Sequence, residues 1–248
     1  AYDLYGDTLE GGEGMTVWEM LRSGLEEIMH EIPPQAVEKL MEYCAMLLEK
    51  NKVMNLTAVT EPAGVVTRHF LDCAALAPYM RAHTRVIDVG TGAGFPGLPL
   101  AVLCPGTEFV LLDALRKRVD FLNEVISSLG LSNCTAIHAL AEEFAADHRE
   151  IFDAAVSRAV AELRVLAELT VPMVKVGGVF YAMKAADCAG EVQAAVHACT
   201  VLGVTSMEQV NYAVPHDGVE RKLVCLKKTA QTPAQYPRRF KKIQSAPL

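Results

Sequence analysis

The sequence lacks any apolar run near the roughly 18 to 20 residues that a membrane-spanning helix requires. Residues 1–14 also lack the basic and then apolar order of a secretory signal. The 7 cysteines form no Cys-x-x-Cys pair and the 7 histidines form no His-x-x-x-His pair, so neither a disulfide framework nor a zinc site is indicated. We therefore expect a cytoplasmic protein with reduced thiols, no metal and no membrane partner.

Acidic residues are missing from one end of the chain. The 248 residues carry a formal net charge of −7, but residues 221–248 contain eight Lys or Arg and no Asp or Glu. The other 15 basic and all 30 acidic residues lie in residues 1–220, so a body of charge −15 carries a tail of charge +8. Phosphate attraction depends on local charge, so this tail is compatible with nucleic-acid binding. On charge alone, a solvated tail without a partner is the alternative.

Two helical segments precede the first strand-like segment. Thr16 and Glu19 form a capping-box pattern before apolar residues at helical spacing, and Pro33-Pro34 ends that helix. A second amphipathic helix follows and ends near Asn51. We therefore expect a disordered lead over residues 1–14 and a small N-terminal helical cap over residues 15–80.

Short apolar runs then alternate with helical patterns. Strands are predicted over residues 85–89, 108–113, 134–139, 152–157 and 178–183, with helices between them and another around 188–201. Such alternation is typical of a parallel sheet with right-handed crossovers. Segments 204–213 and 221–228 follow without a helix between them and predict a terminal antiparallel hairpin. The expected fold is therefore α/β and Rossmann-like, with a mostly parallel seven-stranded sheet over residues 81–230 and a basic C-terminal tail over 231–248.

The strongest local motif is the loop that follows the first predicted strand. Four glycines lie between that strand and a helix that Pro96 can start: Gly90, Gly92, Gly94 and Gly97. Glycines let the backbone turn sharply and approach a ligand, because a side chain would collide with it. The last three fit the dinucleotide pattern G-x-G-x-x-G, which alone does not separate a nicotinamide cofactor from S-adenosylmethionine.

Two carboxylates flank this glycine loop. Asp88 lies two residues before the first glycine, where it favours a ligand with a cationic ammonium group and disfavours a pyrophosphate. Asp113 ends the next predicted strand, where a carboxylate accepts hydrogen bonds from ribose hydroxyls. The two acids therefore favour S-adenosylmethionine over NAD.

Several separated motifs together resemble those of one enzyme family. They are residues 51–57 (NKVMNLT), 68–72 (RHFLD), 88–97 (the glycine loop), 112–118 (LDALRKR), 152–161 (FDAAVSRAVA) and 236–239 (YPRR). In this order they are similar to the RsmG (GidB) family of bacterial S-adenosylmethionine-dependent methyltransferases, which modify guanine N7 in small-subunit (16S) ribosomal RNA. The resemblance covers about residues 35–240. Lys50, Cys73 and the segment after Arg239 depart from the family pattern.

The resemblance implies S-adenosylmethionine as cofactor, and 16S rRNA or the small ribosomal subunit as the partner of a monomeric enzyme. It places Gly90 and Phe95 along the cofactor, Asp113 on its ribose, Ala141 and Glu142 beside the adenine, and Arg158 at the pocket end of the fourth strand. With Asp88, Gly92 and Gly94 from the loop, these residues make up the predicted cofactor site. A helix-start acid is the alternative for Glu142, and a surface salt bridge is the alternative for Arg158.

His69 and Asp72 are three residues apart and are expected to share a helix face. We assign both, with Arg158, to positioning the substrate; a hydrogen-bonded structural pair is the alternative. Guanine N7 carries a free lone pair, so methyl transfer to it needs positioning and no general base. The chain has no Asp/Asn-Pro-Pro-Phe/Tyr motif for exocyclic amines and no Pro-Cys or Thr-Cys pair for cytosine C5.

Basic side chains supply the predicted RNA contacts, namely Arg68, Arg116, Lys117, Arg118, Lys184, Arg238, Arg239, Lys241 and Lys242. Solvated helix charge is the alternative for residues 116–118. The side chains of Arg238, Arg239, Lys241 and Lys242 are expected to lie outside the cofactor crevice, so that replacing all four by Ala weakens RNA binding and leaves cofactor affinity unchanged. Two rival functions are an NAD-linked oxidoreductase, disfavoured by Asp88, by the terminal hairpin and by the lack of a substrate domain, and a non-catalytic S-adenosylmethionine-binding regulator.

Overall fold

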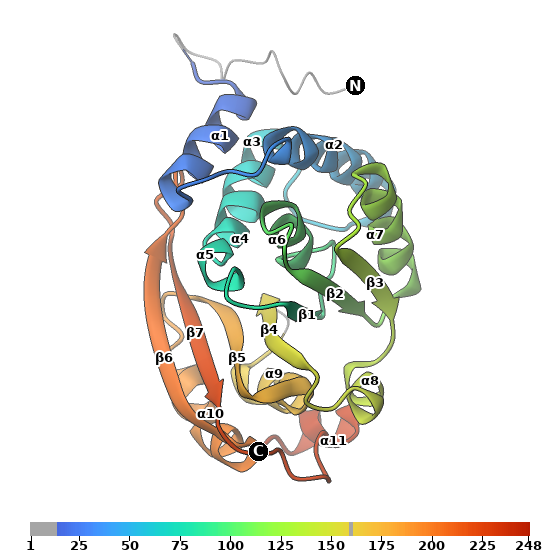
Figure 1. Ribbon diagram of the computed structural model, residues 1–248, viewed down its shortest axis with the longest axis vertical. Coiled ribbons are helices and arrows are strands. Elements are labelled where there is room, and N and C mark those ends of the chain that lie inside the picture. The colour runs from blue at the N-terminus through green and yellow to red at the C-terminus, as the bar shows by residue number, and fades with distance from the viewer. Residues whose placement is uncertain (1–13, 159–160) are drawn as a thin grey trace.

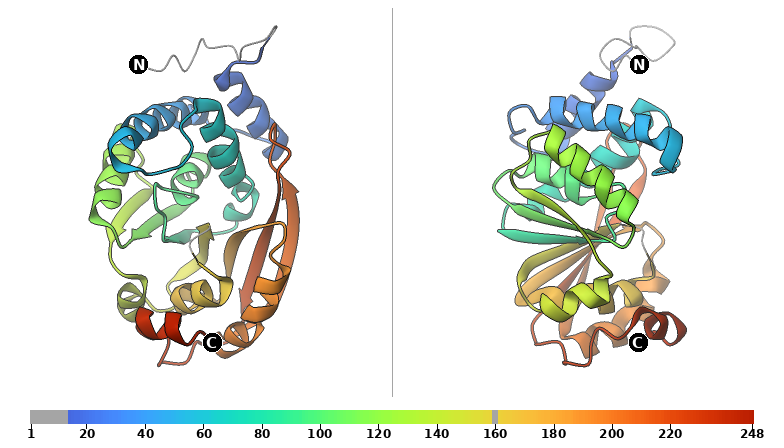
Figure 2. Two further views of the ribbon diagram at one scale, coloured as in Figure 1. Left: turned by 180° about the vertical axis from the view of Figure 1, so that it is seen from behind. Right: turned by 90° about the vertical axis from the view of Figure 1, so that its right-hand side faces the viewer.

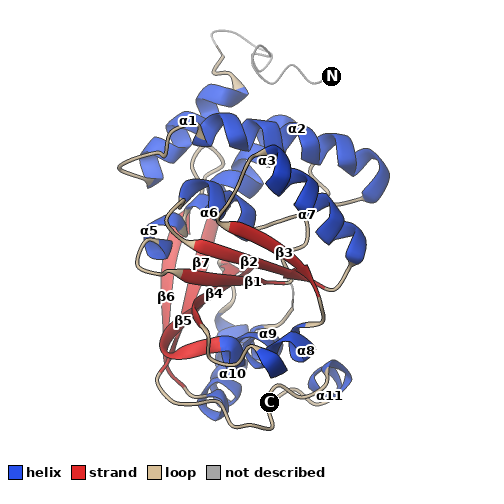
Figure 3. Ribbon diagram, turned by 45° about the vertical axis from the view of Figure 1, so that its right-hand side comes forward, coloured by secondary structure: helices blue, strands red, loops and turns tan. Residues whose placement is uncertain are grey.

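A seven-stranded sheet runs through the middle of the computed structural model, with helices on both faces (Figures 1 and 3). The structure describes residues 14–158 and 161–248, so the expectation of a disordered lead falls, except at Gly14, outside the described residues. The strand order is β3-β2-β1-β4-β5-β7-β6. The strands are β1 (Arg85–Val89), β2 (Glu108–Asp113), β3 (Cys134–His138), β4 (Phe152–Arg158), β5 (Val174–Ala185), β6 (Val204–Ala213) and β7 (Glu220–Lys228).

The pairing of the strands confirms the predicted sheet. β1 to β5 pair in parallel, whereas β7 pairs antiparallel with both β5 and β6. β5 begins at Val174 instead of Gly178, because Val174 pairs with Phe152 ahead of a register shift. The predicted five parallel strands with a terminal hairpin are therefore correct.

Helices cover each face of the sheet, as the edge-on view in Figure 2 shows. Those before β3 are α1 (Val17–Ile28), α2 (Ala36–Met54), α3 (Pro62–Val65), the π-helix η1 (Val66–Leu71), α4 (Asp72–Ala74), α5 (Ala77–Met80), α6 (Gly97–Leu103) and α7 (Arg116–Ser128). Those after β3 are α8 (Ala141–Asp147), α9 (Leu163–Thr170), the 3-10 helix η2 (Val171–Met173), α10 (Ala189–Leu202) and α11 (Phe240–Ser245). Among the described residues, no helix is both long and apolar enough to cross a membrane.

Two apolar cores lie on the two sides of the sheet. Successive strand residues point to opposite faces, so Val86 packs with α1, α2, α6 and α7, and Ile87 packs with α8, α9 and α10. The N-terminal helices share their core with the sheet, since Leu21 and Leu40 lie in one cluster with Val86. The predicted capping box is confirmed at Thr16 and Glu19. The N-terminal helices are thus fixed against the sheet and can support loops at its edge.

The carboxyl ends of β1, β2 and β4 meet at one edge of the sheet. Strand order reverses between β1 and β4, and ligands of open α/β sheets bind in the crevice outside the strand ends at such a point. The glycine loop leaves β1 here, and η1 brings Arg68 and His69 to the same edge. The chain thereby gathers its candidate residues at one place.

Candidate active site

The glycine loop is held open by its backbone and by Asp113. Gly90 and Gly92 have φ angles of 72° and 64°, a left-handed conformation that L side chains rarely adopt. Asp113 Oδ2 accepts a hydrogen bond from the Gly92 amide at 2.9 Å, and its Oδ1 accepts one from the Leu115 amide at 2.9 Å. A Cβ atom built on Gly92 would meet nothing within 4 Å. The loop is therefore fixed with an empty space beside Gly92.

Gly94 serves packing and not ligand contact. A Cβ atom at Gly94 would lie 2.6 Å from the Tyr43 hydroxyl and 2.9 Å from Leu122. Tyr43 is fully buried on α2 and donates a hydrogen bond to the Ala93 carbonyl. Gly94 lines none of the cavities around the loop described below. The expectation that it contacts the cofactor is corrected, since it lets α2 pack beneath the loop.

Asp88 also lies beneath the loop. Its side chain is 0% exposed, and its Oδ2 accepts a hydrogen bond from the Gly97 amide at 2.8 Å. Burial raises the pKa of Asp88 to about 7. Asp88 therefore fixes the start of α6, and its predicted contact with a ligand ammonium group stays a prediction.

The first cavity lies outside the ends of β1, β2 and β3 and measures about 140 Å³. Asp113, Ala141 and Glu142, the residues expected beside the ribose and adenine, all line it. The rest of the lining is mainly apolar: Val89, Gly90, Leu112, Ala114, Ala139, Leu140, Leu166, Leu169 and Phe240. Glu142 also lies in the first turn of α8, where an acidic side chain interacts favourably with the helix dipole. The alternative role of a helix-start acid is therefore compatible with its place in the cavity.

A second cavity of about 330 Å³ continues along the glycine loop. Gly90 lines both cavities and joins them. The other lining residues are Leu56, Thr57, His69, Thr91, Gly92, Ala93, Phe95, Arg118 and Arg158. Three predicted cofactor residues, Gly92, Phe95 and Arg158, thus lie together here.

A third cavity of about 350 Å³ opens on the other side of Arg158. Its lining residues are Val59, Arg68, His69, Asp72, Arg158, Met183, Lys184, Ala185, Tyr212 and Arg221. Because His69 and Arg158 line both this cavity and the second one, they form the wall between the two. The three cavities therefore form a row along the strand ends.

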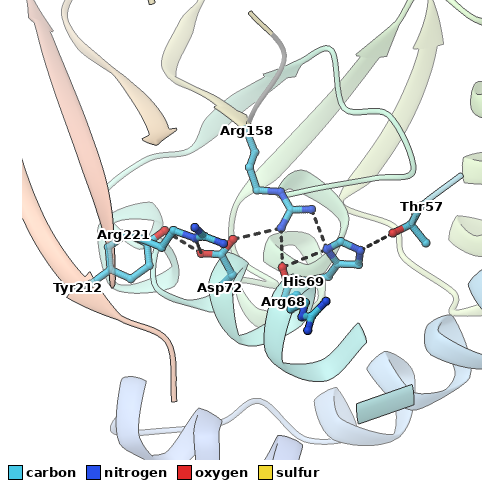
Figure 4. Close-up of polar contacts among 7 residues, drawn as sticks. All are labelled: Thr57, Arg68, His69, Asp72, Arg158, Tyr212 and Arg221. Carbon is cyan, nitrogen blue, oxygen red and sulfur yellow. Dashed lines mark hydrogen bonds and ion pairs between the residues drawn. The ribbon is translucent and has the colours of Figure 1, made fainter. Parts of the chain in front are cut away.

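Arg158 is the centre of the polar contacts in this wall (Figure 4). One guanidinium nitrogen donates to Asp72 Oδ2 at 3.2 Å and to the Arg68 carbonyl at 3.0 Å, and the other lies 3.0 Å from His69 Nδ1. The guanidinium carbon is 4.9 Å from the centre of the Phe95 ring. With its side chain 16% exposed, Arg158 is a partly buried bridge and not the surface salt bridge that was the alternative.

His69 is held as a neutral ring. Its centre lies 4.4 Å from that of Phe95, in a stacked arrangement. His69 Nδ1 lies 3.0 Å from both the Arg158 guanidinium and the Arg68 carbonyl oxygen, and Nε2 lies 2.7 Å from Thr57 Oγ1. Burial and the neighbouring Arg158 lower the pKa of His69 to about 3. His69 is therefore a weak base that orients Arg158.

We expect the rate of methyl transfer to show no titration of His69 near its usual pKa of about 6.5. Replacing His69 by Ala should lower the single-turnover rate about 10- to 100-fold by misplacing Arg158, and should leave the shape of the pH profile unchanged. Rapid-quench measurements between about pH 5.5 and 8.5 on both proteins test this. A wild-type rate that falls below about pH 6.5, with the fall erased in His69→Ala, would mean that the ring transfers a proton.

The same shift affects folding stability. The pKa of His69 is lower in the folded than in the unfolded chain, so the unfolded chain binds more protons between about pH 6.5 and pH 3. The contribution of the neutral ring is fully present above that window and is lost as the pH falls through it.

Asp72 and His69 both contact Arg158, but the structure shows no hydrogen bond between Asp72 and His69. Its Oδ1 accepts a hydrogen bond from the Tyr212 hydroxyl at 2.8 Å and lies 4.0 Å from Arg221 Nε. Tyr212 and Arg221 face each other across the β6–β7 pairing. The sequence-based interpretation missed both residues, because nothing local links a terminal hairpin to the helix of Asp72. The alternative of a hydrogen-bonded structural pair is therefore wrong, and His69 and Asp72 instead both contact Arg158.

The predicted RNA-binding residues are divided by the structure into exposed and engaged ones. Arg68, Arg116, Lys117, Arg239, Lys241 and Lys242 are exposed, and Arg118 is half-buried 3.6 Å from Asp113. Lys184 is buried, with its Nζ 2.5 Å from Glu191 and 2.8 Å from the Ala161 carbonyl. Arg238 pairs with the buried Glu168 at 2.6 Å. Lys184 and Arg238 are therefore each already paired with a carboxylate, which corrects the prediction that they contact RNA.

Metal binding finds no support among the described residues, which contain no group of three or more His, Cys, Asp or Glu that could hold an ion. The fold is shared with solved methyltransferases. An O-methyltransferase from Bacillus cereus in complex with SAH superposes with a TM-score of 0.55 at 16% identity, covering 75% of this chain and 91% of that one. The chain therefore has a Rossmann-like α/β fold of the kind found in that methyltransferase.

The family follows from the sequence comparisons. The family model described as "GidB: rRNA small subunit methyltransferase G" matches residues 36–224. Curated relatives named ribosomal RNA small subunit methyltransferase G include one from Alkaliphilus metalliredigens, 43% identical over 89% of this chain and 94% of its own length. Another, from Alkaliphilus oremlandii, is 40% identical over 94% of this chain and 100% of its own length. The chain belongs to the rRNA small subunit methyltransferase G family, which decides against the oxidoreductase and non-catalytic alternatives.

Proposed function

We propose that this methyltransferase transfers a methyl group from S-adenosylmethionine to N7 of a guanine in 16S rRNA. The observation that carries the proposal is the row of three cavities, joined at Gly90 and then at His69 and Arg158. Residues of the first cavity would hold the adenosine of the cofactor and residues of the second its methionine, and His69 and Arg158 separate the second cavity from the third. The third cavity, lined by Arg68 and Arg221, suits an anionic nucleotide.

The residues of the first two cavities fit S-adenosylmethionine. The space beside Gly92 would be filled by any Cβ atom, and the apolar lining of the first cavity suits an adenine ring. Asp113 uses one lone pair of each oxygen for the Gly92 and Leu115 amides, and a carboxylate has further acceptor sites for ribose hydroxyls. We therefore assign Gly90, Gly92, Phe95, Asp113, Ala141, Glu142 and Arg158 to the cofactor.

The chemistry requires positioning alone. When bound, S-adenosylmethionine supplies an electrophilic methyl group. Guanine N7 carries a free lone pair, so its methylation would release no proton and would need no general base. Arg158, held by Asp72 and His69, fixes the wall that both reactants contact. A site whose histidine is a weak base suits such a reaction.

The target base has to leave its helical stack to reach the third cavity. We propose that the phosphates around it contact the exposed cations at this edge, Arg68, Arg116 and Lys117, with the half-buried Arg118 and Arg221 deeper in the cleft. Arg239, Lys241 and Lys242, on and before α11, remain proposed contacts on the neighbouring surface. We also propose that the enzyme acts as a monomer in the cytoplasm.

The double variant Arg116→Ala/Lys117→Ala is expected to lower the slope of log affinity against log salt by about 1.4 to 1.8, or 0.7 to 0.9 for each lost phosphate contact. Filter binding of rRNA at several salt concentrations measures this slope. The matched control is Arg81→Ala/Lys227→Ala, which removes two exposed cations away from this edge: Arg81 precedes β1, and Lys227 pairs with Val179 in the first half of β5. If both double variants keep the wild-type slope, the phosphates do not contact α7.

The proposed activity is tested with the purified protein, labelled S-adenosylmethionine, and either naked 16S rRNA or small subunits. We expect label in RNA and 7-methylguanosine as the only labelled nucleoside after complete digestion and mass spectrometry. Label in an exocyclic-amine or C5-methylated nucleoside would overturn the assignment of N7, and the absence of labelled RNA with both substrates would overturn the activity.

A further inference from the structure

The first cavity has one wall that comes from the far end of the chain. Phe240, the first residue of α11, lines it together with Asp113 and Glu142. Phe240 remains 37% exposed, whereas Ile243, one turn further along α11, is fully buried. An aromatic ring at the mouth of an apolar cavity, on a helix otherwise anchored by a buried residue, is placed to contact a ligand there.

The segment that carries Phe240 is fixed to the body of the protein. Ile243 packs against Val165 and Leu169 of α9. Glu168, 0% exposed on the same helix, accepts from the backbone amide of Arg238 at 2.9 Å, from its Nε at 2.7 Å and from its Nη2 at 2.6 Å. Such a buried carboxylate needs its charged partner, so this pair holds the chain just before α11 in place.

A second contact joins α11 to the adenine end of the cavity. The Phe240 backbone amide donates to Glu142 Oε1 at 3.3 Å. Among the described residues, Glu142 Oε2 has no hydrogen-bond partner, and a free carboxylate oxygen can accept from an exocyclic amine of a purine. The C-terminal helix thus orients the carboxylate that faces the ligand.

We propose that Phe240 is a cofactor-binding residue, and that its ring packs against the adenine of S-adenosylmethionine while its backbone amide orients Glu142. This inference rests on the proposed function of the first cavity. None of the four basic side chains Arg238, Arg239, Lys241 and Lys242 lines the first cavity, whereas Phe240 between them does, on α11 (Figure 1, red, beside α8 and α9).

Calorimetry with S-adenosylhomocysteine tests the proposal. Loss of an aromatic ring from a base is expected to raise the dissociation constant of Phe240→Ala about tenfold, and Phe240→Trp should stay close to the wild type. Val196→Ala is the matched control, since Val196 is a comparably exposed apolar residue, 40% accessible, on α10. Its affinity should equal that of the wild type.

A second probe separates contact with adenine from other effects. 5′-Methylthioadenosine keeps adenine and ribose but lacks the amino acid, so Phe240→Ala should weaken it by the same factor as S-adenosylhomocysteine. If only S-adenosylhomocysteine loses affinity, Phe240 does not act on the adenine and the proposal is wrong. Equal affinity of Phe240→Ala and wild type for both probes also overturns it, whereas failure of the wild type to bind either probe overturns the proposed function itself.

Discussion

Gly92→Val is expected to abolish the binding of S-adenosylhomocysteine, the largest effect that a single change should have on the cofactor site. A Cβ atom at Gly92 would enter the space left open beside the loop, and the valine methyl groups would extend further into it. The φ angle of 64° adds backbone strain, since a β-branched residue rarely adopts it. Calorimetry should detect no heat of binding at ligand concentrations that saturate the wild type.

The matched control for this variant is Gly130→Val. Gly130 has a φ angle of 58°, and its Cβ atom would also meet nothing within 4 Å, but it lies between α7 and β3, near the amino end of the sheet. The two variants should lose similar thermal stability, and only Gly92→Val should lose ligand binding. Equal loss of binding in both, or wild-type affinity in Gly92→Val, would contradict the assignment of the loop to the cofactor.

Arg158→Ala is expected to lower kcat about 100-fold or more, because misplacement of reactants by about 1 Å can cost that much. The change removes the group that contacts Asp72, His69 and Phe95 at once. The change also removes the closer ion-pair partner of Asp72, which is Arg158. The other partner, Arg221, has its Nε 4.0 Å from Asp72 Oδ1. Steady-state methyl transfer to rRNA, with thermal unfolding as the test for folded protein, measures the effect.

Two further variants sharpen this prediction. Arg158→Lys retains the charge but cannot present the planar set of donors that reaches several acceptors, so it should remain strongly impaired. Arg164→Ala, which removes an arginine paired with exposed Glu162 on the surface, should keep wild-type turnover. In Arg158→Ala the pKa of His69, followed by NMR, should rise, because one of its two main lowering influences is lost. Full activity of Arg158→Lys would mean that charge alone suffices.

The sheet could be predicted from local patterns because each strand segment contains its own run of apolar residues. Residues 85–89 and 108–113 are apolar runs bounded by polar or turn residues, and both match β1 and β2 at each end. The π-helix η1 could not be predicted, because the apolar and polar residues of so short a segment fit an α-helix as well. It carries His69, and Asp72 follows as the first residue of α4, so that both contact Arg158 without pairing with each other.

The parts of the site that directly follow neighbouring parallel strands could be predicted from the sequence. The contacts made by distant segments could not. Gly92 and Asp113 follow successive strands, and parallel strands end at the same edge. Tyr212 and Phe240 reach the site from β6 and α11, which requires knowledge of tertiary packing. Asp88 could have been recognised as buried, because it stands inside the apolar run Val86–Val89 with no polar neighbour.

The most direct test of the central claim maps N7-methylated guanines in 16S rRNA from cells that lack this protein, from cells complemented with the wild type and from cells complemented with Arg158→Ala. We expect one guanine to lose N7 methylation without the protein, to regain it with the wild type and to stay unmodified with Arg158→Ala. Unchanged N7 methylation of 16S rRNA in cells that lack the protein would contradict the claim.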